Sequence, residues 1–474
     1  MTFTSVLFLF RFLPIFLLLY YVAPAKIKNT VLLLGSLFFY AWEEIGFLPW
    51  LAGAIVLTYL CALGISKFTK SPLPRRLLFL IGVGVNLGLL VWVKYTGEGV
   101  FAPEAWLGTT LLRAVLPLGI SFYIFRSISY LRDVLRQDNA AEKNIVDFGV
   151  YCLFFPVVAS GPFIQYKDML GALKSPKTRI SLAGIDEGIS LFIIGLAKKV
   201  LLAGSLGSLW AAVMGRYSNG ALQSGGSGIG LNTVSTPLAW LLLLTFALWL
   251  YFELSGYISM GQGLAAMLGF SFPASFSSPY TSRSLTQFGS AWHGTLSGWF
   301  KRYIYLPLCG KAPSGGKKIF ALFITCLLFG LWLAPGLNFI LLALYLFVVL
   351  VVEQTVLLPK LKKAVIWPHL YLFIVLIPAM ALFAAATPGA GLQPLFARLF
   401  TPHEGAGAIY YLRSYAAPLI ISLICCTPLP AKLYGRVEKH KWLRLIVMAV
   451  LLLLSVVYLF RSNTGAGFDL YRTF

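Results

Sequence analysis

Acidic residues are scarce in this sequence: 16 Asp and Glu stand against 38 Lys and Arg, and charged residues make up only 11% of its 474 residues. Ordinary soluble domains carry roughly 25% charged residues. Because 59% of the residues are hydrophobic, the chain lacks the polar surface that a soluble globular domain needs. Long polar segments are rare as well, and apolar runs recur from one end of the chain to the other.

The apolar runs predict an all-α, polytopic transmembrane helical bundle. A helix needs about 20 predominantly apolar residues to cross the hydrocarbon core, which gives roughly 11 to 13 spans here. The whole chain, 1–474, is expected to form a single membrane domain. The expected spans are 4–24, 30–42, 47–66, 76–95, 107–127, 145–164, 185–214, 236–270, 318–334, 336–358, 364–386, 409–427 and 442–461.

The net charge of +22 raises the question of nucleic-acid binding, but the basic residues lie in short loops between apolar runs. Nucleic-acid binders instead gather them on one soluble face. Basic short loops indicate the cytoplasmic side of a membrane and contact with anionic lipid headgroups. We therefore expect the lipid bilayer, and no nucleic acid, as a partner. The three basic loops contain Lys67, Lys70, Arg75 and Arg76; Lys360, Lys362 and Lys363; and Lys432, Arg436, Lys439, Lys441 and Arg444.

Metal-binding patterns are missing from the sequence. The six cysteines show no CxxC spacing, and the four histidines form no pair at a metal-ligand spacing. No metal site is therefore expected. The segment 215–235, with its Ser- and Gly-rich stretch Ser224–Gly228, predicts a flexible surface loop.

Glu253 is a carboxylate within an aromatic, apolar run, Trp249–Tyr257. Ionisable residues at membrane depth are costly and often mark functional sites. Two explanations stay open: Glu253 serves the reaction, or it is a structural partner of a nearby arginine. Arg283 is one candidate for that partner.

The densest group of chemically active side chains lies in Trp292–Leu308, within the Pro-rich stretch 271–317. On a continuous helix, His293, Leu296 and Phe300 would share one face beside that of Trp292. Histidine is the commonest general base because its pKa lies near working pH. A structural role for this lone histidine remains the alternative. Segment 251–335 is the expected site-bearing core.

The chain resembles the membrane-bound O-acyltransferase family, and within it the alginate O-acetyltransferase-like branch. The likeness covers most of the chain and rests on the order and spacing of its motifs. These motifs are Gly35–Trp42, Leu116–Tyr130, Phe154–Pro156, Ser160–Pro162, Gly195–Val200, Tyr251–Tyr257, Pro279–Ser284 and Trp292–Leu308.

The resemblance implies a funnel or tunnel among short and broken helices, where an acyl group, in this branch acetyl, passes to a hydroxyl. The donor would be a cytoplasmic thioester, acetyl-CoA or an acyl carrier, used as a substrate and not as a bound cofactor. The acceptor would be an extracytoplasmic polysaccharide, as in alginate O-acetylation, reached through an exported or periplasmic acyltransferase partner. The branch is bacterial, which implies the inner membrane.

If the chain is a working acyltransferase, His293 is the expected catalytic base. Glu253, Arg283, Tyr303 and Trp292 are the expected supporting residues.

The sequence departs from the family pattern at the second histidine, which is the family's principal catalytic histidine. The family's Gly-Leu-Trp-His-Gly motif corresponds here to Gly330–Pro335, in which Leu333 occupies the histidine position. Leucine neither accepts a proton nor forms hydrogen bonds. Other polar positions are also replaced, with Ser259 for Asp and Gln287 for Glu.

Two functions therefore stay open: an acyltransferase that uses His293, or a catalytically impaired homologue that acts as a scaffold or acyl conduit. A transporter would show paired intramembrane charges and inverted repeats, and neither is evident in the sequence.

Overall fold

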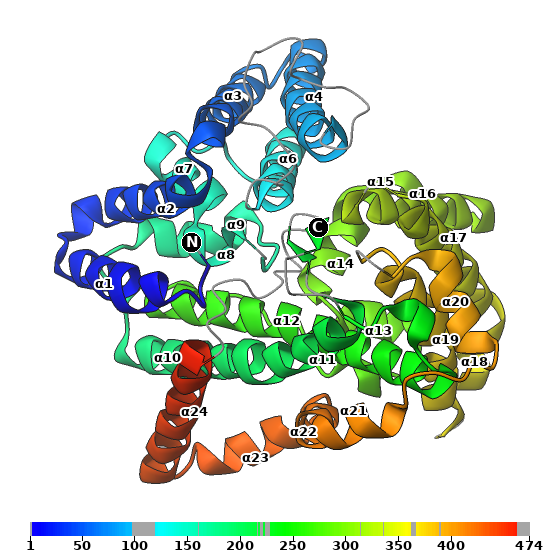
Figure 1. Cartoon of the computed structure of the whole chain (residues 1–474). Coiled ribbons are helices and arrows are strands. Elements are labelled where there is room, and N and C mark those ends of the chain that lie inside the picture. The colour runs from blue at the N-terminus through cyan, green and yellow to red at the C-terminus, as the bar shows by residue number, and fades with distance from the viewer. Residues whose placement is uncertain are drawn as a thin grey trace. The chain divides into compact units, whose positions relative to one another are not determined.

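The computed structural model describes residues 2–96, 119–159, 161–215, 217–218, 221–222, 228–312, 314–334, 336–361, 366–387 and 390–461. Helices dominate these residues (Figure 1). The chain divides into two compact units. Unit 1 comprises Met1–Ile193 and Tyr257–Pro273, and unit 2 comprises Ile194–Gly256 and Ala274–Phe474.

The prediction of a helical membrane protein is confirmed. Eight helices of the described residues are long and apolar enough to span a bilayer, and a ninth span results if the pair Ala408–Ser414 and Ala416–Cys425, bent by 71°, counts as one. The expected span 145–164 is instead broken at Phe154 into two short helices. The expected span 107–127 lies partly outside the described residues. The central funnel stays a prediction.

Unit 1 is built from short apolar helices and one bundle. Figure 1 shows α3, α4 and α6 side by side. The helices of this unit are η1 (Phe8–Phe12), α1 (Leu13–Val22), η2 (Ala25–Ile27), α2 (Lys28–Glu44), η3 (Ile45–Phe47), α3 (Leu48–Lys67), α4 (Pro72–Thr96), α6 (Ile120–Arg136), α7 (Ile145–Leu153), α8 (Phe155–Val158) and α9 (Tyr166–Lys174).

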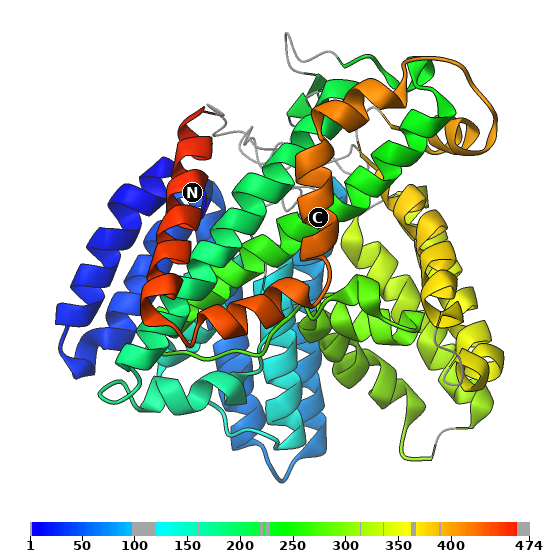
Figure 2. The same ribbon diagram turned by 90° about the horizontal axis from the view of Figure 1, so that it is seen from below.

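Two long helical segments contribute residues to both units (Figure 2). One consists of α10 (Leu182–Ala197), the π-helical turn η5 (Lys198–Ala203) and α11 (Gly204–Met214), and the other is α12 (Thr236–Met267). Within unit 2 they are antiparallel, since Gly256 lies against Lys199 whereas Gly207 lies against Trp249.

Unit 2 contains the remaining helices and, inside the expected loop 215–235, two paired strands of two residues each. These elements are β1 (Tyr217–Ser218), β2 (Ala221–Leu222), η6 (Leu231–Thr233), η7 (Pro279–Thr281), α13 (Leu285–Ala291), α14 (Gly294–Phe300), η8 (Lys301–Tyr305), α15 (Leu306–Cys309), α16 (Gly315–Leu333), α17 (Leu337–Val352), η9 (Glu353–Leu357), α18 (Leu358–Leu361), α19 (Trp367–Ala384), α20 (Leu392–Phe400), α21 (Ala408–Ser414), α22 (Ala416–Cys425), α23 (Leu429–Val437) and α24 (Lys441–Arg461).

Burial separates interior from peripheral helices. In α12, 72% of the most apolar window is buried by the protein, against 11% in α24. Trp442, Leu445 and Leu453 of α24 are exposed large apolar residues, as expected of a helix whose surface faces lipid tails. A helix that is apolar all round and largely covered by protein, such as α12, belongs to the core. Any charge on α12 must therefore be neutralised within the protein.

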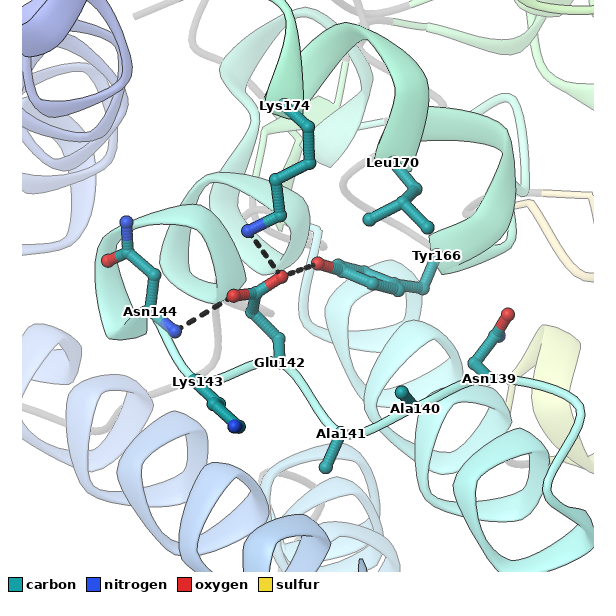
Figure 3. A pocket seen from close by; sticks show the side chains of 9 residues that line it. All are labelled: Asn139, Ala140, Ala141, Glu142, Lys143, Asn144, Tyr166, Leu170 and Lys174. Atoms are coloured by element: carbon teal, nitrogen blue, oxygen red, sulfur yellow. Dashed lines mark hydrogen bonds and ion pairs between the residues drawn. The ribbon is translucent and has the colours of Figure 1, made fainter.

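A buried carboxylate ties the α6–α7 connection of unit 1 to α9 (Figure 3). Glu142 is 7% exposed and accepts hydrogen bonds from the Tyr166 hydroxyl and from the backbone N–H of Asn144, the latter at 2.8 Å. Lys174 Nζ lies 2.8 Å from its Oε2. Burial by itself would raise the pKa of Glu142, but the hydrogen bonds from Lys174, Tyr166 and Asn144 lower it below its ordinary value of 4.5.

The same network continues to the start of α2. Lys174 Nζ also lies 2.8 Å from Asp147 Oδ2, and Asn29 Nδ2 donates to Asp147 Oδ1 at 2.7 Å. Arg179 donates to Asn29 Oδ1 at 2.7 Å and to the Tyr20 hydroxyl at 2.8 Å. Side chains far apart in the sequence thus hold the ends of α2, α7 and α9 together.

This end of unit 1 is also its basic end. Lys67 ends α3 and Lys70 follows it, Arg75 lies in the first turn of α4 and Arg136 ends α6. Arg75 Nη2 donates to the carbonyl of Leu135 at 2.6 Å, so the basic ends of α4 and α6 meet. By the positive-inside rule, we expect this end to face the cytoplasm.

We predict that Glu142→Gln lowers the stability of the protein in a pH-dependent way. The loss should be roughly 1.5 to 3 kcal/mol per hydrogen bond to the charged group at neutral pH. The pKa of Glu142 is lowered in the folded protein. The stabilisation of the fold by the Glu142 carboxylate is therefore complete above pH 4.5, and it disappears as the pH falls through the folded-state pKa. The difference from the wild type should therefore shrink below about pH 4.5.

Thermal unfolding of the purified protein, followed by tryptophan fluorescence across pH, measures this difference. Glu187→Gln, a change at an exposed glutamate, is the matched control and should unfold like the wild type. Equal unfolding temperatures for Glu142→Gln and the wild type at pH 7 would refute the assigned role of Glu142.

Candidate active site

His293 lies at a break between two short helices of unit 2. The shared faces considered in the sequence analysis apply only to a continuous helix, and the chain has none here: α13 ends at Ala291 and α14 begins at Gly294. His293 itself adopts a left-handed backbone conformation with φ 47°, which is uncommon for any residue other than glycine.

Backbone hydrogen bonds on both sides hold this conformation. Gly294 N–H donates to the carbonyl of Ser275 at 2.7 Å, and Ser277 N–H donates to the carbonyl of Ala291 at 3.1 Å. The segment Ser275–Ser277 therefore binds the chain before and after His293. Left-handed geometry at a non-glycine residue costs roughly 1 to 2 kcal/mol and persists only where its surroundings determine it. The position of the imidazole is thus set by tertiary contacts.

His293 is 7% exposed, and its imidazole faces the hydroxyl of Thr295, which in turn contacts that of Ser275. Thr295 Oγ1 lies 3.4 Å from His293 Nδ1, and Ser275 Oγ lies 3.0 Å from Thr295 Oγ1. The ring of Phe276 lies 5.8 Å from the imidazole, centroid to centroid. When Nδ1 carries the proton and donates it to Thr295, Nε2 has the lone pair that a general base needs. Sequence reasoning missed Ser275 and gave Thr295 no role in the site.

Trp292 anchors the break in an aromatic cluster. Its ring lies 5.4 Å from that of Phe288, 5.5 Å from Phe276, 5.9 Å from Tyr280 and 6.0 Å from Tyr251. Aromatic pairs at such distances contribute about 0.5 to 1.5 kcal/mol each beyond the area they bury. The contact with Tyr251 joins the break to α12. The supporting role of Trp292 in the reaction stays a prediction.

Glu353, which the sequence analysis missed, binds the first turn of α13. Its side chain is 0% exposed and accepts hydrogen bonds from the backbone N–H groups of Leu285 at 2.6 Å and Thr286 at 2.9 Å, and from the Tyr371 hydroxyl at 3.0 Å. A carboxylate at a helix start satisfies N–H groups that have no partner within the helix. The signal was present, because Glu353 directly follows the apolar run of α17 and begins η9 within a segment long enough to span the membrane.

The carboxylate of Glu253 forms an ion pair with Lys199. The two side chains are 5% and 7% exposed, and they come from neighbouring helical segments, α12 and η5. The segments approach closely at Gly256, where a Cβ atom would lie 2.8 Å from the backbone nitrogen of Lys199. Only glycine allows this approach, which brings the lysine within reach of the carboxylate.

This pair corrects two expectations. Arg283 was the candidate partner of Glu253, but its side chain is exposed and its backbone N–H donates to Gln287 Oε1 at 2.9 Å. A paired intramembrane charge, which the sequence did not reveal, is present as Lys199 and Glu253. The partner is Lys199 because helix packing, which the linear sequence does not show, sets which helices are neighbours.

Tyr303 lies beyond α14, in the π-helical turn η8. Its ring packs 5.4 Å from that of Trp299, and the Arg302 guanidinium lies 5.7 Å from its centroid. These contacts support the C-terminal continuation of α14. The role of Tyr303 in the reaction stays a prediction.

Leu333 ends α16 within an apolar cluster. It is 7% exposed and packs with Phe339, Leu342, Ala379 and Leu382. The helix that follows His293 reaches the same region, since the ring of Phe300 lies 6.3 Å from that of Trp332. The end of α14 and the end of α16 are therefore neighbours within unit 2. The position where the resemblance places a second histidine is filled by close-packed hydrocarbon.

No group of three or more His, Cys, Asp or Glu side chains that could hold a metal ion is found in the part of the chain that the structure describes.

Comparisons with known proteins identify the relatives of this chain. The membrane-bound O-acyltransferase family pattern matches residues 37–383. The chain is 37% identical to a probable alginate O-acetylase of Pseudomonas putida over 72% of its own length and 67% of the relative's length. It is 36% identical to a probable alginate O-acetylase of Azotobacter vinelandii, over 72% and 66%. It is 29% identical to a peptidoglycan O-acetyltransferase of Helicobacter pylori, over 71% and 67%.

The alignments thus span about two thirds of each relative. The resemblance inferred from the motifs is confirmed.

We predict that Lys199→Met destabilises the protein by about 3 to 5 kcal/mol, because it leaves the Glu253 carboxylate buried without its counter-charge. The double variant Lys199→Met/Glu253→Leu removes both charges and should regain most of that stability. Thermal unfolding in detergent measures both variants. Lys432→Met, at an exposed lysine of α23, is the control for loss of one positive charge. A double variant as unstable as the single one would contradict the importance of the pair.

Proposed function

Because the chain belongs to the membrane-bound O-acyltransferase family, we propose that it transfers an acetyl group from a cytoplasmic thioester to a polysaccharide hydroxyl beyond the membrane. O-acyltransferase is the enzyme class that the family assigns. The names of the relatives specify O-acetylation of alginate and of peptidoglycan, which supports acetyl as the acyl group and a glycan as the acceptor. An exported partner would complete delivery to that polymer.

The observation that carries this proposal is the buried His293 imidazole, with Nδ1 turned to the hydroxyl of Thr295. In the proposed step, Nε2 takes the proton of the acceptor hydroxyl while its oxygen attacks the thioester carbonyl. The carbon–sulfur bond breaks, and the leaving thiolate receives the proton from the imidazolium. The products are an ester and a free thiol. A positioned base and bound reactants suffice for this chemistry because thioesters are already reactive.

The membrane setting fits a reaction between two compartments. Eight apolar helices among the described residues are long enough to span a bilayer, and the protein is an integral membrane protein. We place it in the bacterial inner membrane, with the basic end of unit 1 towards the cytoplasmic donor.

A second candidate function has its own support, the packing of Leu333. The apolar cluster around this side chain offers no proton acceptor at the position of the family's second histidine. A chain that has lost this group would serve as a scaffold or acyl conduit for another acyltransferase.

We predict that the purified protein transfers radiolabelled acetyl from acetyl-CoA to an alginate oligosaccharide, and that His293→Ala lowers the rate at least about 100-fold, the usual contribution of a general base. His369→Ala, at an exposed histidine, is the matched control and should retain the wild-type rate. A wild-type protein without activity, together with transfer by Leu333→His, would favour the scaffold function. Transfer that survives in His293→Ala would reject this histidine as the base.

We predict that Thr295→Val lowers kcat roughly tenfold at an unchanged KM for the donor, because the imidazole loses the partner that orients Nδ1. Thr295→Ser keeps the hydroxyl and should restore most of kcat. The pH–rate profile of Thr295→Val should also move, since the hydroxyl contacts the titrating ring. A loss that is equal for valine and serine would indicate a packing role only.

A further inference from the structure

Helix α23 (Leu429–Val437) of unit 2 carries an apolar face that the described residues leave largely uncovered. Leu429, Leu433 and Val437 are spaced four residues apart, so they lie on one line along the helix. Leu429 and Leu433 are 49% and 48% exposed, and none of the nine residues of α23 is buried. Such a face needs a surface that takes it out of water.

Helix α9 shows how the protein treats a similar face elsewhere. It also has nine residues and also combines apolar side chains with lysines, but its apolar residues Tyr166, Met169 and Leu173 are buried within unit 1. The fold therefore covers the apolar face of one short amphipathic helix and leaves that of the other, α23, at the surface.

Basic side chains border the apolar face of α23. Lys432 and Arg436 lie one turn apart, on a line beside that of the leucines, and both are exposed. Neither forms an ion pair within the part of the chain that the structure describes. Three more basic residues follow before position 445, and Glu438 is the only acidic residue in 429–444. This excess of positive charge attracts anionic surfaces.

The junction with α24 places α23 at the surface of the membrane. Helix α24 is one of the eight helices that are long and apolar enough to span a bilayer. Trp442 in its first turn is 81% exposed, and tryptophan is enriched at the boundary between headgroups and acyl chains. The chain turns between α23 and α24 in both Figure 1 and Figure 2. A helix that leaves the end of a span at an angle runs along the membrane surface.

These observations favour lipid over a second protein as the surface that covers α23. The helix is joined directly to α24, whose exposed apolar residues face lipid tails. Lysine and arginine beside an apolar line can keep their stems on hydrocarbon while their charges reach the headgroups. A short helix with an apolar face and a basic border is typical of segments that lie in the membrane interface.

We propose that α23 lies in the plane of the membrane surface, with Leu429 and Leu433 among the acyl chains and with Lys432 and Arg436 bound to the phosphates of anionic phospholipids. The inference goes beyond the general expectation for basic loops, because it assigns a helix, its orientation and a headgroup site. It does not depend on the proposed acyl transfer.

The first experiment measures how deeply the two faces of α23 lie in the membrane. Leu433→Cys and Gly435→Cys carry a fluorophore on opposite faces of the helix, and Gly435 has open space for the added side chain. The full chain also carries Cys425→Ser, because Cys425 is the one native cysteine that is not buried. The vesicles contain phosphatidylcholine and phosphatidylglycerol with brominated acyl chains, which quench fluorophores that lie among those chains.

We expect strong quenching for Leu433→Cys and little for Gly435→Cys. Equal quenching at the two positions would overturn the proposed orientation. The absence of quenching for Leu433→Cys would show that protein or water covers this face, and it would overturn the membrane location as well.

The second experiment measures which lipid lies beside the fluorophore of Leu433→Cys. Brominated phosphatidylglycerol or the same fraction of brominated phosphatidylcholine is added to unbrominated phosphatidylcholine vesicles. Lys432→Gln/Arg436→Gln removes the two charges beside the apolar face. Lys167→Gln/Lys177→Gln removes two charges at exposed lysines in and after α9 and is the matched control.

We expect a roughly tenfold preference for phosphatidylglycerol at this position, because each basic side chain near the surface attracts anionic lipid. The preference should disappear in Lys432→Gln/Arg436→Gln, persist in the control and weaken at high salt. A preference that survives the removal of Lys432 and Arg436, or that the control loses equally, would overturn the headgroup site. Both readouts involve no turnover, so they leave the acyl-transfer test independent.

Discussion

A polar group withdrawn from water inside a membrane has to find its partner within the protein, and the rest of this structure depends on that constraint. The buried carboxylates show two solutions. Glu253 of α12 is neutralised by Lys199 of η5, an ion pair between two helical segments. Glu353 binds the backbone N–H groups that begin α13, which joins an acidic side chain to a helix end. Each solution fixes one helix against another. The need to give every buried charge a partner therefore also determines how these helices pack.

The geometry around His293 follows from these anchors. Glu353 orients α13, the aromatic contacts of Trp292 join the end of α13 to α12, and Ser275 and Ser277 hydrogen-bond to the backbone around the histidine. His293 can thus occupy a left-handed conformation that isolated chains rarely adopt. The same framework surrounds Leu333 with hydrocarbon. A leucine there needs no hydrogen-bond partner, and its apolar neighbours gain packing contacts from it.

Unit 1 meets the constraint in a different way because its polar network lies at the ends of helices. Lys174 bridges Glu142 and Asp147 while remaining partly exposed, so its charge stays near water. The desolvation free energy of a charge at such a position is small, so several charges can lie there. Unit 2 instead buries two carboxylates inside the protein, Glu253 paired with Lys199 and Glu353 bound by backbone N–H groups.

The sequence by itself determined the class of the protein. Its apolar runs, few charges and basic loops are composition-level signals, and lipid admits few structures other than helices for such a chain. Family motifs in the right order further determined the relationship and pointed to His293 and Leu333. The long spans Leu182–Met214 and Thr236–Met267 were also predictable, because apolar length alone decides them.

Only the tertiary structure decided which side chains meet. Lys199 is separated from Glu253 by a loop and most of two helices, and the exposed Arg283 was closer in sequence. Ser275 contacts Thr295 because the chain reverses between them, and α13 stops before His293 because backbone hydrogen bonds from Ser275–Ser277 outweigh the helical pattern. Helical periodicity describes one segment at a time. The break at His293 and the ion pair of Lys199 arise between segments, where packing decides which of several locally acceptable conformations is stable.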